Sequence, residues 1–201
     1  METPARTAEH LARVKQRETS LRSVCATLLK PGSPVVWEVG CGHGHFLAAY
    51  AAAHPDRLCV GIDLSAERIG RAERKRTRGR LANLHFIQAE AGAFLKALPD
   101  HVRFSEVFVL FPDPWPKRRH HKNRLMQGAF LEAVAARAGE GTRLFFRTDD
   151  ESYFDYAEYV IRSMPHWTLS GEGWPFEVST VFQERAASHR SLVALRTKAI
   201  P

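Results

Sequence analysis

A glycine-rich turn beside an acidic residue is the first place in the sequence where chemistry can be expected. In EVGCGHG, Glu38 lies near the end of the apolar run VVWEV, and Gly40, Gly42 and Gly44 follow that run. Glycines let a backbone take positive φ and approach a ligand, at the strand end where open α/β sheets bind nucleotides. Dinucleotide sites instead carry GxGxxG, and Glu38 would repel a pyrophosphate. The pattern favours a ligand with a cationic end over NAD or a purely structural turn.

A second carboxylate follows about one βα unit later. Asp63 ends the apolar run LCVGID, where its two oxygens can accept hydrogen bonds from both hydroxyls of a ribose. EVGCGHG resembles the first motif of the class I S-adenosylmethionine methyltransferases, which implies S-adenosylmethionine as the cofactor. In that family the end of the third strand holds the adenine, which implies a side-chain contact from Glu90 and a backbone contact from Ala91.

The loop FPDPWPKRRHHKNR offers a rigid platform for a second ligand. Its prolines fix φ and stiffen the backbone, so that Asp113 and Trp115 are presented in a defined direction. Asp113 can accept hydrogen bonds from the N1 and N2 protons of guanine, on the edge opposite N7. N7 already carries a lone pair, so methyl transfer to it requires orientation and needs neither a metal nor a covalent nucleophile. Trp115 either stacks on a base or packs as an anchor beneath the loop.

A dense basic run adjoins this loop. The chain has a formal net charge of +7, which favours a polyanionic partner without proving one. The candidate contacts to nucleic-acid phosphates are Lys117, Arg119, Lys122 and Arg124, and the alternative is a solvated positive surface. We favour the contacts because the run lies at the edge of the sheet where the cofactor is expected.

FPDPWPKRRHHKNR looks like the signature of the tRNA guanine-N7 methyltransferases, which modify the variable-loop guanine of tRNA, guanine 46. The resemblance runs in the family's order from Val35 to Asp149. It implies that Asp113 belongs to the active site and that Lys117 and Asp149 contact the substrate.

The family also has a TxFE-type substrate segment before its last strand. Here Thr180 and Phe182 match, but Gln183 stands where a glutamate is usual. Either the amide of Gln183 replaces the carboxylate as an acceptor, or Glu184 takes that place after a local shift.

The elements that must position these residues form a βα alternation. Short apolar runs alternate with helix-patterned segments, LMQGAFLEAVAARA among them, which is typical of a largely parallel sheet. We expect an α/β, Rossmann-like class I methyltransferase fold: a mostly parallel seven-stranded sheet with helices on both faces. Residues 1–30 read as a basic amino-terminal extension and residues 31–201 as the methyltransferase domain. The predicted strands are VVWEV, LCVGID, LHFIQA, EVFVLF, RLFFRT, HWTLS and SLVALRTK.

Composition narrows the class of protein further. With 201 residues, 44% of them hydrophobic, the chain has the size of one globular domain. Its 3 cysteines show no metal-ligand spacing, and no apolar run is long enough for a membrane span. We expect a cytoplasmic monomer or homodimer that binds tRNA and no metal. The alternatives are an RNA-binding protein that keeps the fold without catalysis and another nucleobase methyltransferase, although amino-methyltransferases carry a second proline where this chain has Trp115.

Overall fold

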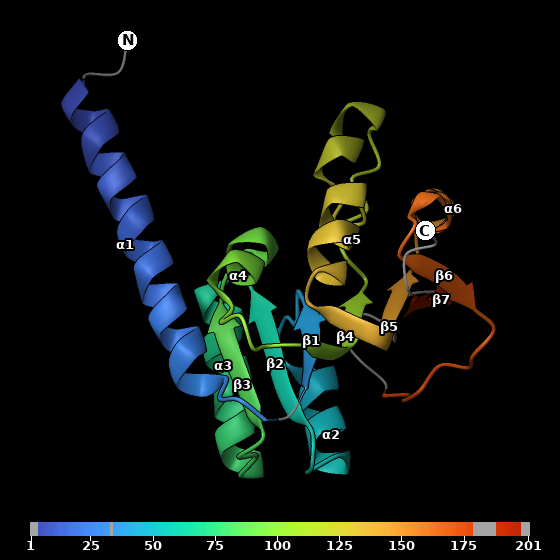
Figure 1. Ribbon diagram of the computed structural model, residues 1–201, viewed down its shortest axis with the longest axis horizontal. Coiled ribbons are helices and arrows are strands. Elements are labelled where there is room, and N and C mark those ends of the chain that lie inside the picture. Colours follow the sequence, from blue (N-terminus) through green and yellow to red (C-terminus); the bar gives the residue numbers. More distant parts are fainter. Residues whose placement is uncertain (1–3, 33, 179–187, 198–201) are drawn as a thin grey trace.

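The computed structural model describes residues 4–32, 34–178 and 188–197, which form one seven-stranded sheet flanked by helices (Figure 1). The strand order is β3-β2-β1-β4-β5-β7-β6, with β7 antiparallel to both of its neighbours and the other pairs parallel. The elements are α1 (Pro4–Leu28), β1 (Val35–Val39), α2 (His45–Ala53), β2 (Leu58–Asp63), α3 (Ala66–Gly79), β3 (Leu84–Gln88), α4 (Ala91–Ala97), β4 (Phe104–Leu110), the 3₁₀ helix η1 (Arg118–Asn123), α5 (Gly128–Ala135), β5 (Ala138–Thr148), α6 (Glu151–Ser163), β6 (Trp167–Ser170) and β7 (Arg190–Arg196). The predicted Rossmann-like fold is confirmed.

Each of the seven predicted apolar runs forms a strand, but one predicted helix is shorter than expected. The segment LMQGAFLEAVAARA was expected to be helical throughout, whereas α5 covers only its middle. Gln127 is extended at the helix start, and the backbone N–H of Met126 donates to the Tyr153 hydroxyl. At the other end, Ala138 already pairs with Phe104 of β4. A hydrogen bond to Tyr153 of α6 at one end and strand pairing with β4 at the other therefore override helix propensity.

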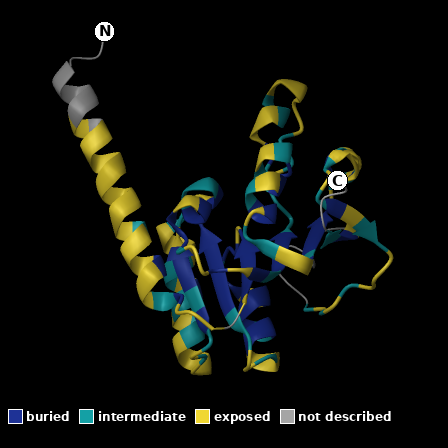
Figure 2. Ribbon diagram, in the orientation of Figure 1, coloured by how far each residue is buried: buried dark blue, intermediate teal, exposed yellow. Residues whose placement is uncertain are grey.

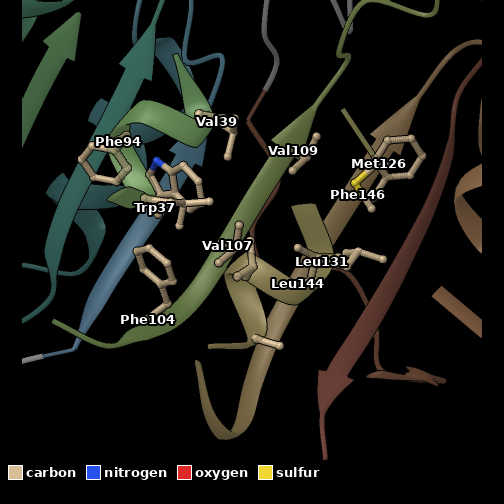
Figure 3. Packing of buried hydrophobic residues seen from close by; sticks show 14 of the residues in the cluster. Trp37, Val39, Phe94, Phe104, Val107, Val109, Met126, Leu131, Leu144 and Phe146 are labelled. Atoms are coloured by element: carbon tan, nitrogen blue, oxygen red, sulfur yellow. The ribbon is translucent and has the colours of Figure 1, made fainter. Parts of the chain in front are cut away.

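Alternation along the strands divides the interior into two hydrophobic layers, one on each face of the sheet. Side chains of α2 and α3 pack in one layer, and those of α4, α5 and α6 pack in the other together with the end of α1. Figure 3 shows the second layer, where Trp37 stacks on Phe104 with ring centroids 5.0 Å apart. The central strands are buried at nearly every position (Figure 2). Because these parallel strands expose neither face, their residues are mostly apolar.

Helix α1 is attached to the domain by its last turns. Cys25 and Leu29 are fully buried in the layer that contains α4, whereas Leu11 and Val14 are exposed. The amino-terminal half of α1 extends away from the sheet (Figures 1 and 2). Among the described residues, no helix is both long and apolar enough to cross a membrane.

A loop replaces a helix over part of the sheet. Trp174, Phe176 and Val178, which follow β6, pack against the layer formed with α2. The ring of Trp174 meets the rings of Phe108 and Phe145 edge-on, with centroids 6.5 and 5.6 Å apart. Residues 174–178 therefore cover the sheet over β4 and β5.

Candidate functional site

The glycine-rich turn lies at the carboxyl end of β1 and borders a cavity of about 620 Å³. Gly40, Gly42 and Gly44 all have positive φ, between 54° and 74°. A Cβ at Gly40 or Gly42 would have no protein atom within 4 Å, so these two positions leave room beside the cavity. A Cβ at Gly44 would lie 2.5 Å from Cζ of Phe86, which excludes any side chain there. The turn thus needs glycine for its backbone conformation and, at Gly44, for packing.

Glu38 supplies a buried carboxyl group to this cavity. Its residue exposure is 4%, and Oε2 has no hydrogen-bond partner among the described residues. Burial, opposed by a backbone hydrogen bond from Leu47 and assisted by the negative charge of Asp63, raises the pKa of Glu38 to about 8. A cationic group in the cavity would satisfy the free oxygen and favour the ionised form. The site therefore fits the amino-acid end of S-adenosylmethionine.

Asp63 ends β2 on the other side of the turn. Its Oδ2 accepts a hydrogen bond from the backbone N–H of Gly42 at 3.0 Å, and its Oδ1 accepts one from Ser65 at 2.8 Å. The guanidinium of Arg68 lies 3.6 Å from Oδ2. Asp63 thus fixes the glycine-rich turn relative to the start of α3 and still lines the cavity, where a ribose hydroxyl can reach it.

Glu90 and Ala91 line the same cavity at the end of β3. The carboxylate of Glu90 caps α4 by accepting hydrogen bonds from the backbone N–H groups of Gly92 and Ala93, both at 2.9 Å. Because each carboxylate oxygen has a second lone pair, an exocyclic amine can still approach it. The residues predicted to bind the cofactor are therefore brought together around one cavity, except Gly44, which packs against Phe86 and does not line it.

The FPDPW loop closes the cavity from the side of β4. Phe111, Pro112, Asp113 and Trp115 line the cavity, and Asp113 is exposed. Phe111 and Trp115 have positive φ, 48° and 46°, which is uncommon for residues with a side chain and indicates a strained loop held by its surroundings. The predicted substrate group thus lies next to the predicted cofactor groups.

The basic run after this loop divides into two kinds of residue. Lys117, Arg119 and Lys122 are exposed at or within η1. Arg124 is only 2% exposed, and its guanidinium donates to the carbonyl of Pro114 at 2.9 Å and to the hydroxyl of Ser152 at 2.8 Å. The sequence placed Arg124 among the phosphate contacts, whereas the structure places it inside, between the FPDPW loop and α6.

Asp149 is exposed directly after β5, and it does not line the cavity. Its neighbour Asp150 caps α6 by accepting a hydrogen bond from Tyr153 at 2.7 Å. The remaining predicted substrate residues, Thr180, Phe182 and Gln183, lie outside the described residues.

Arg147 is a site-supporting residue that the sequence interpretation missed. It is 4% exposed in β5, donates to both carboxylate oxygens of Glu177 at 2.9 and 2.7 Å, and lies 3.9 Å from the ring centroid of Trp174. Its carbonyl accepts a hydrogen bond from the backbone N–H of Phe111 at 2.8 Å. The available signal was an arginine inside the otherwise apolar run LFFRT, because a buried charge requires specific partners.

The relatives of this chain include proteins named tRNA (guanine-N(7)-)-methyltransferase. A Thermus thermophilus protein named tRNA (guanine-N(7)-)-methyltransferase is 39% identical over 124 residues, which cover 62% of this chain and 40% of the relative. A Magnetococcus marinus protein of the same name is 36% identical over 143 residues, 70% of this chain and 55% of the relative. The matched part of the chain thus spans about half the length of these relatives.

Solved structures agree on the fold. The 16S rRNA methyltransferase KamB has a TM-score of 0.61 at 21% identity, with 89% of this chain and 92% of that chain covered. TrmN from Thermus thermophilus has a TM-score of 0.59 at 17% identity, with 89% and 48% covered. The family described as "Putative methyltransferase" matches residues 32–186, which include the glycine-rich turn and the FPDPW loop. The chain belongs to this methyltransferase family.

Proposed function

We propose that this chain methylates N7 of guanine in tRNA, at the variable-loop position 46, with S-adenosylmethionine as the methyl donor. The single observation that carries the proposal is the shared cavity: Glu38 and Asp63 line it on one side, and Asp113 lines it on the other. The name of the relatives, tRNA (guanine-N(7)-)-methyltransferase, supports the choice of substrate.

On the cofactor side, the chain contributes carboxyl groups and a glycine backbone that a ligand can approach closely. Glu38 holds the amino group of the cofactor, Asp63 the ribose hydroxyls, and Glu90 with the backbone of Ala91 the adenine. When bound, S-adenosylmethionine would supply an electrophilic sulfonium methyl group; in-line attack by the N7 lone pair of guanine would form the N–C bond as the C–S bond breaks and S-adenosylhomocysteine leaves. Gly40 and Gly42 leave the space beside the cavity that a bound ligand requires.

On the substrate side, the chain orients the base. Asp113 accepts hydrogen bonds from the N1 and N2 protons and so turns N7 toward the methyl group. Lys117, Arg119 and Lys122 neutralise tRNA phosphates beside this loop, and Asp149, Thr180, Phe182 and Gln183 are the further substrate contacts in this proposal. Because N7 loses no proton when it is methylated, the rate depends on proximity and orientation more than on acid-base catalysis.

The proposal is tested with unmodified tRNA, radiolabelled S-adenosylmethionine and nucleoside analysis of the product. We expect one labelled N7-methylguanosine per tRNA and no label when guanine 46 is replaced by adenine. Label in another nucleoside, or none in any tRNA, would overturn the proposal. If the protein then bound tRNA but not S-adenosylmethionine in calorimetry, it would be the non-catalytic RNA-binding protein instead.

The role of Asp113 is tested separately. We expect Asp113→Asn to lower kcat about 100-fold or more with little change in tRNA affinity, since the amide accepts and donates in the wrong places for the guanine edge. The matched control is Asp56→Asn, an exposed carboxylate that does not line the cavity. Equal turnover in the two variants would show that Asp113 does not orient the substrate.

A further inference from the structure

Helix α3 carries a row of arginines that the proposed catalysis does not use. The helix and its cap contain the cations Arg68, Arg71, Arg74, Lys75, Arg76, Arg78 and Arg80, and only the acids Glu67 and Glu73. Arg71, Arg74 and Arg78 follow one another at intervals of three and four residues, which places them on one side of the helix. All three are exposed. We call Arg71, Arg74 and Arg78 the α3 row.

The positive charge of this helix is poorly neutralised. Glu67 pairs with Arg71 at 2.7 Å, and Glu73 is shared between Arg76 at 2.8 Å and the backbone N–H of Phe86 at 3.1 Å. Arg74 and Arg78 form no ion pair with any described residue.

Like charges also crowd one another on α3. Burial lowers the pKa of Lys75, and the charge of Arg78 lowers it further. Like charges at helical spacing destabilise a helix, so α3 is less stable in the free protein than a mixed-charge helix would be. A bound polyanion would relieve this repulsion.

The α3 row begins near the proposed site and leads away from it. Because α3 follows β2, its first turn lies at the edge of the sheet that holds the cavity, and Arg68 lines the cavity there. Arg78 lies about 15 Å further along the helix axis, at 1.5 Å per residue. The row lies on the face of the sheet covered by α2 and α3, in a different part of the sequence from the run that contains Lys117 and Lys122.

The side chains of the α3 row indicate which class of ligand this surface can bind. Arginine presents a planar fork of donors that matches phosphate oxygens. No large hydrophobic side chain of α3 is exposed, so the helix lacks the apolar anchors that a protein interface or a membrane-surface helix requires. The chemistry is that of a nucleic-acid backbone.

We infer that the α3 row binds phosphates of the tRNA backbone at a distance from the methylated base. This inference rests on the proposed function, because it uses the same tRNA as the ligand. The base enters the cavity, and a neighbouring stretch of the backbone lies along α3. The row therefore adds affinity for tRNA without contributing to the chemistry of methyl transfer.

The test compares two triple variants with the same change in net charge. The first is Arg71→Gln, Arg74→Gln and Arg78→Gln on α3. The control is Lys30→Gln, Lys96→Gln and Arg162→Gln, three exposed cations on the face covered by α1, α4 and α6. The measurements are the tRNA dissociation constant from 50 to 300 mM NaCl, S-adenosylmethionine binding by calorimetry, and the methyl-transfer rate at saturating tRNA.

We expect the α3 variant to bind tRNA about tenfold more weakly at low salt, with a log–log salt slope smaller by about 2 to 3, as for the loss of three phosphate contacts. Its cofactor affinity and saturated rate stay those of the wild type, and the control keeps the wild-type slope. Equal salt slopes for the α3 variant and the wild type, or equal losses in both triple variants, would overturn the inference. A wild type that binds tRNA but does not methylate it would instead contradict the proposed function and leave this measurement valid.

Discussion

The two halves of the candidate site are built in different ways. On the cofactor side, Asp63 and Glu90 lie at the ends of β2 and β3, and most of their contacts are to residues two or three positions away. On the substrate side, Arg124 bonds across 28 residues to Ser152, and Arg147 bonds across 30 to Glu177. The first half depends on local backbone geometry, whereas the second depends on buried arginines that connect distant segments. The two halves should therefore respond differently to substitution.

The largest effect should come from the glycine-rich turn itself. Gly44→Val adds a side chain against Phe86 and Ala72 at a positive φ, and we expect a loss of stability of about 4 kcal/mol, which lowers Tm by about 8–16 °C. Gly40→Ala meets only the backbone strain, about 1–2 kcal/mol, because no atom lies near its Cβ. Thermal unfolding of the two variants measures both. Equal losses would mean that packing at Gly44 contributes nothing beyond φ.

The next effect is electrostatic and concerns Glu38. Its pKa in the folded protein is about 8, against an ordinary value of 4.5, so between these pH values the folded state carries more protons than the unfolded chain. Stability attributable to Glu38 therefore falls as pH rises through this window. A cofactor ammonium favours the ionised carboxylate, so its binding releases a proton, and we expect affinity to rise by up to about tenfold per pH unit from pH 5 to 7.5.

Calorimetry in buffers of different ionisation enthalpy checks both the affinity and the released proton. Glu38→Gln should weaken binding and flatten the pH profile, whereas the exposed control Glu132→Gln should keep the wild-type profile. A pH-independent wild type would show that Glu38 is not the partner of the cationic end.

On the substrate side, Arg124→Met should separate positioning from phosphate binding. The variant removes the bonds to Pro114 and Ser152, which hold the FPDPW loop against α6, and we expect kcat to fall about 100-fold because the loop that carries Asp113 shifts. The salt slope of tRNA binding should stay unchanged. Lys122→Met, an exposed neighbour, should do the reverse and reduce the slope by about 1 with kcat intact. A reduced slope for Arg124→Met with normal kcat would restore its predicted role as a phosphate contact.

The same contrast explains what the sequence could predict. The seven strands, the glycine-rich turn and the acidic residues at strand ends follow from local signals: apolar runs, glycine spacing and position after a strand. Arg124 was misplaced because in KRRHHKNR nothing local distinguishes a buried guanidinium from exposed ones. Its partners Pro114 and Ser152 are adjacent only after β4, β5 and α6 have packed. For Arg147 the apolar run LFFRT gave a local sign of burial, but its partners Glu177 and Trp174 reach it from beyond β6 and no local pattern indicates them.

The smallest effect, and the sharpest test of the long-range half, is the coupling between Arg147 and Glu177. The side chain of Arg147 is 5% exposed and that of Glu177 is 58% exposed. Solvent therefore screens the charge of Glu177 but has little access to that of Arg147. A double-mutant cycle with Arg147→Met and Glu177→Gln should give a coupling energy of about 1–2 kcal/mol in urea unfolding. The comparison pair Arg143 and Glu172 makes one hydrogen bond at 2.8 Å, against two for Arg147 and Glu177, and both of its side chains are 44% exposed. Its coupling should be about 0.2–1 kcal/mol and should vanish in 1 M salt. If the two cycles agreed, neither the burial of Arg147 nor its second hydrogen bond to Glu177 would strengthen the contact.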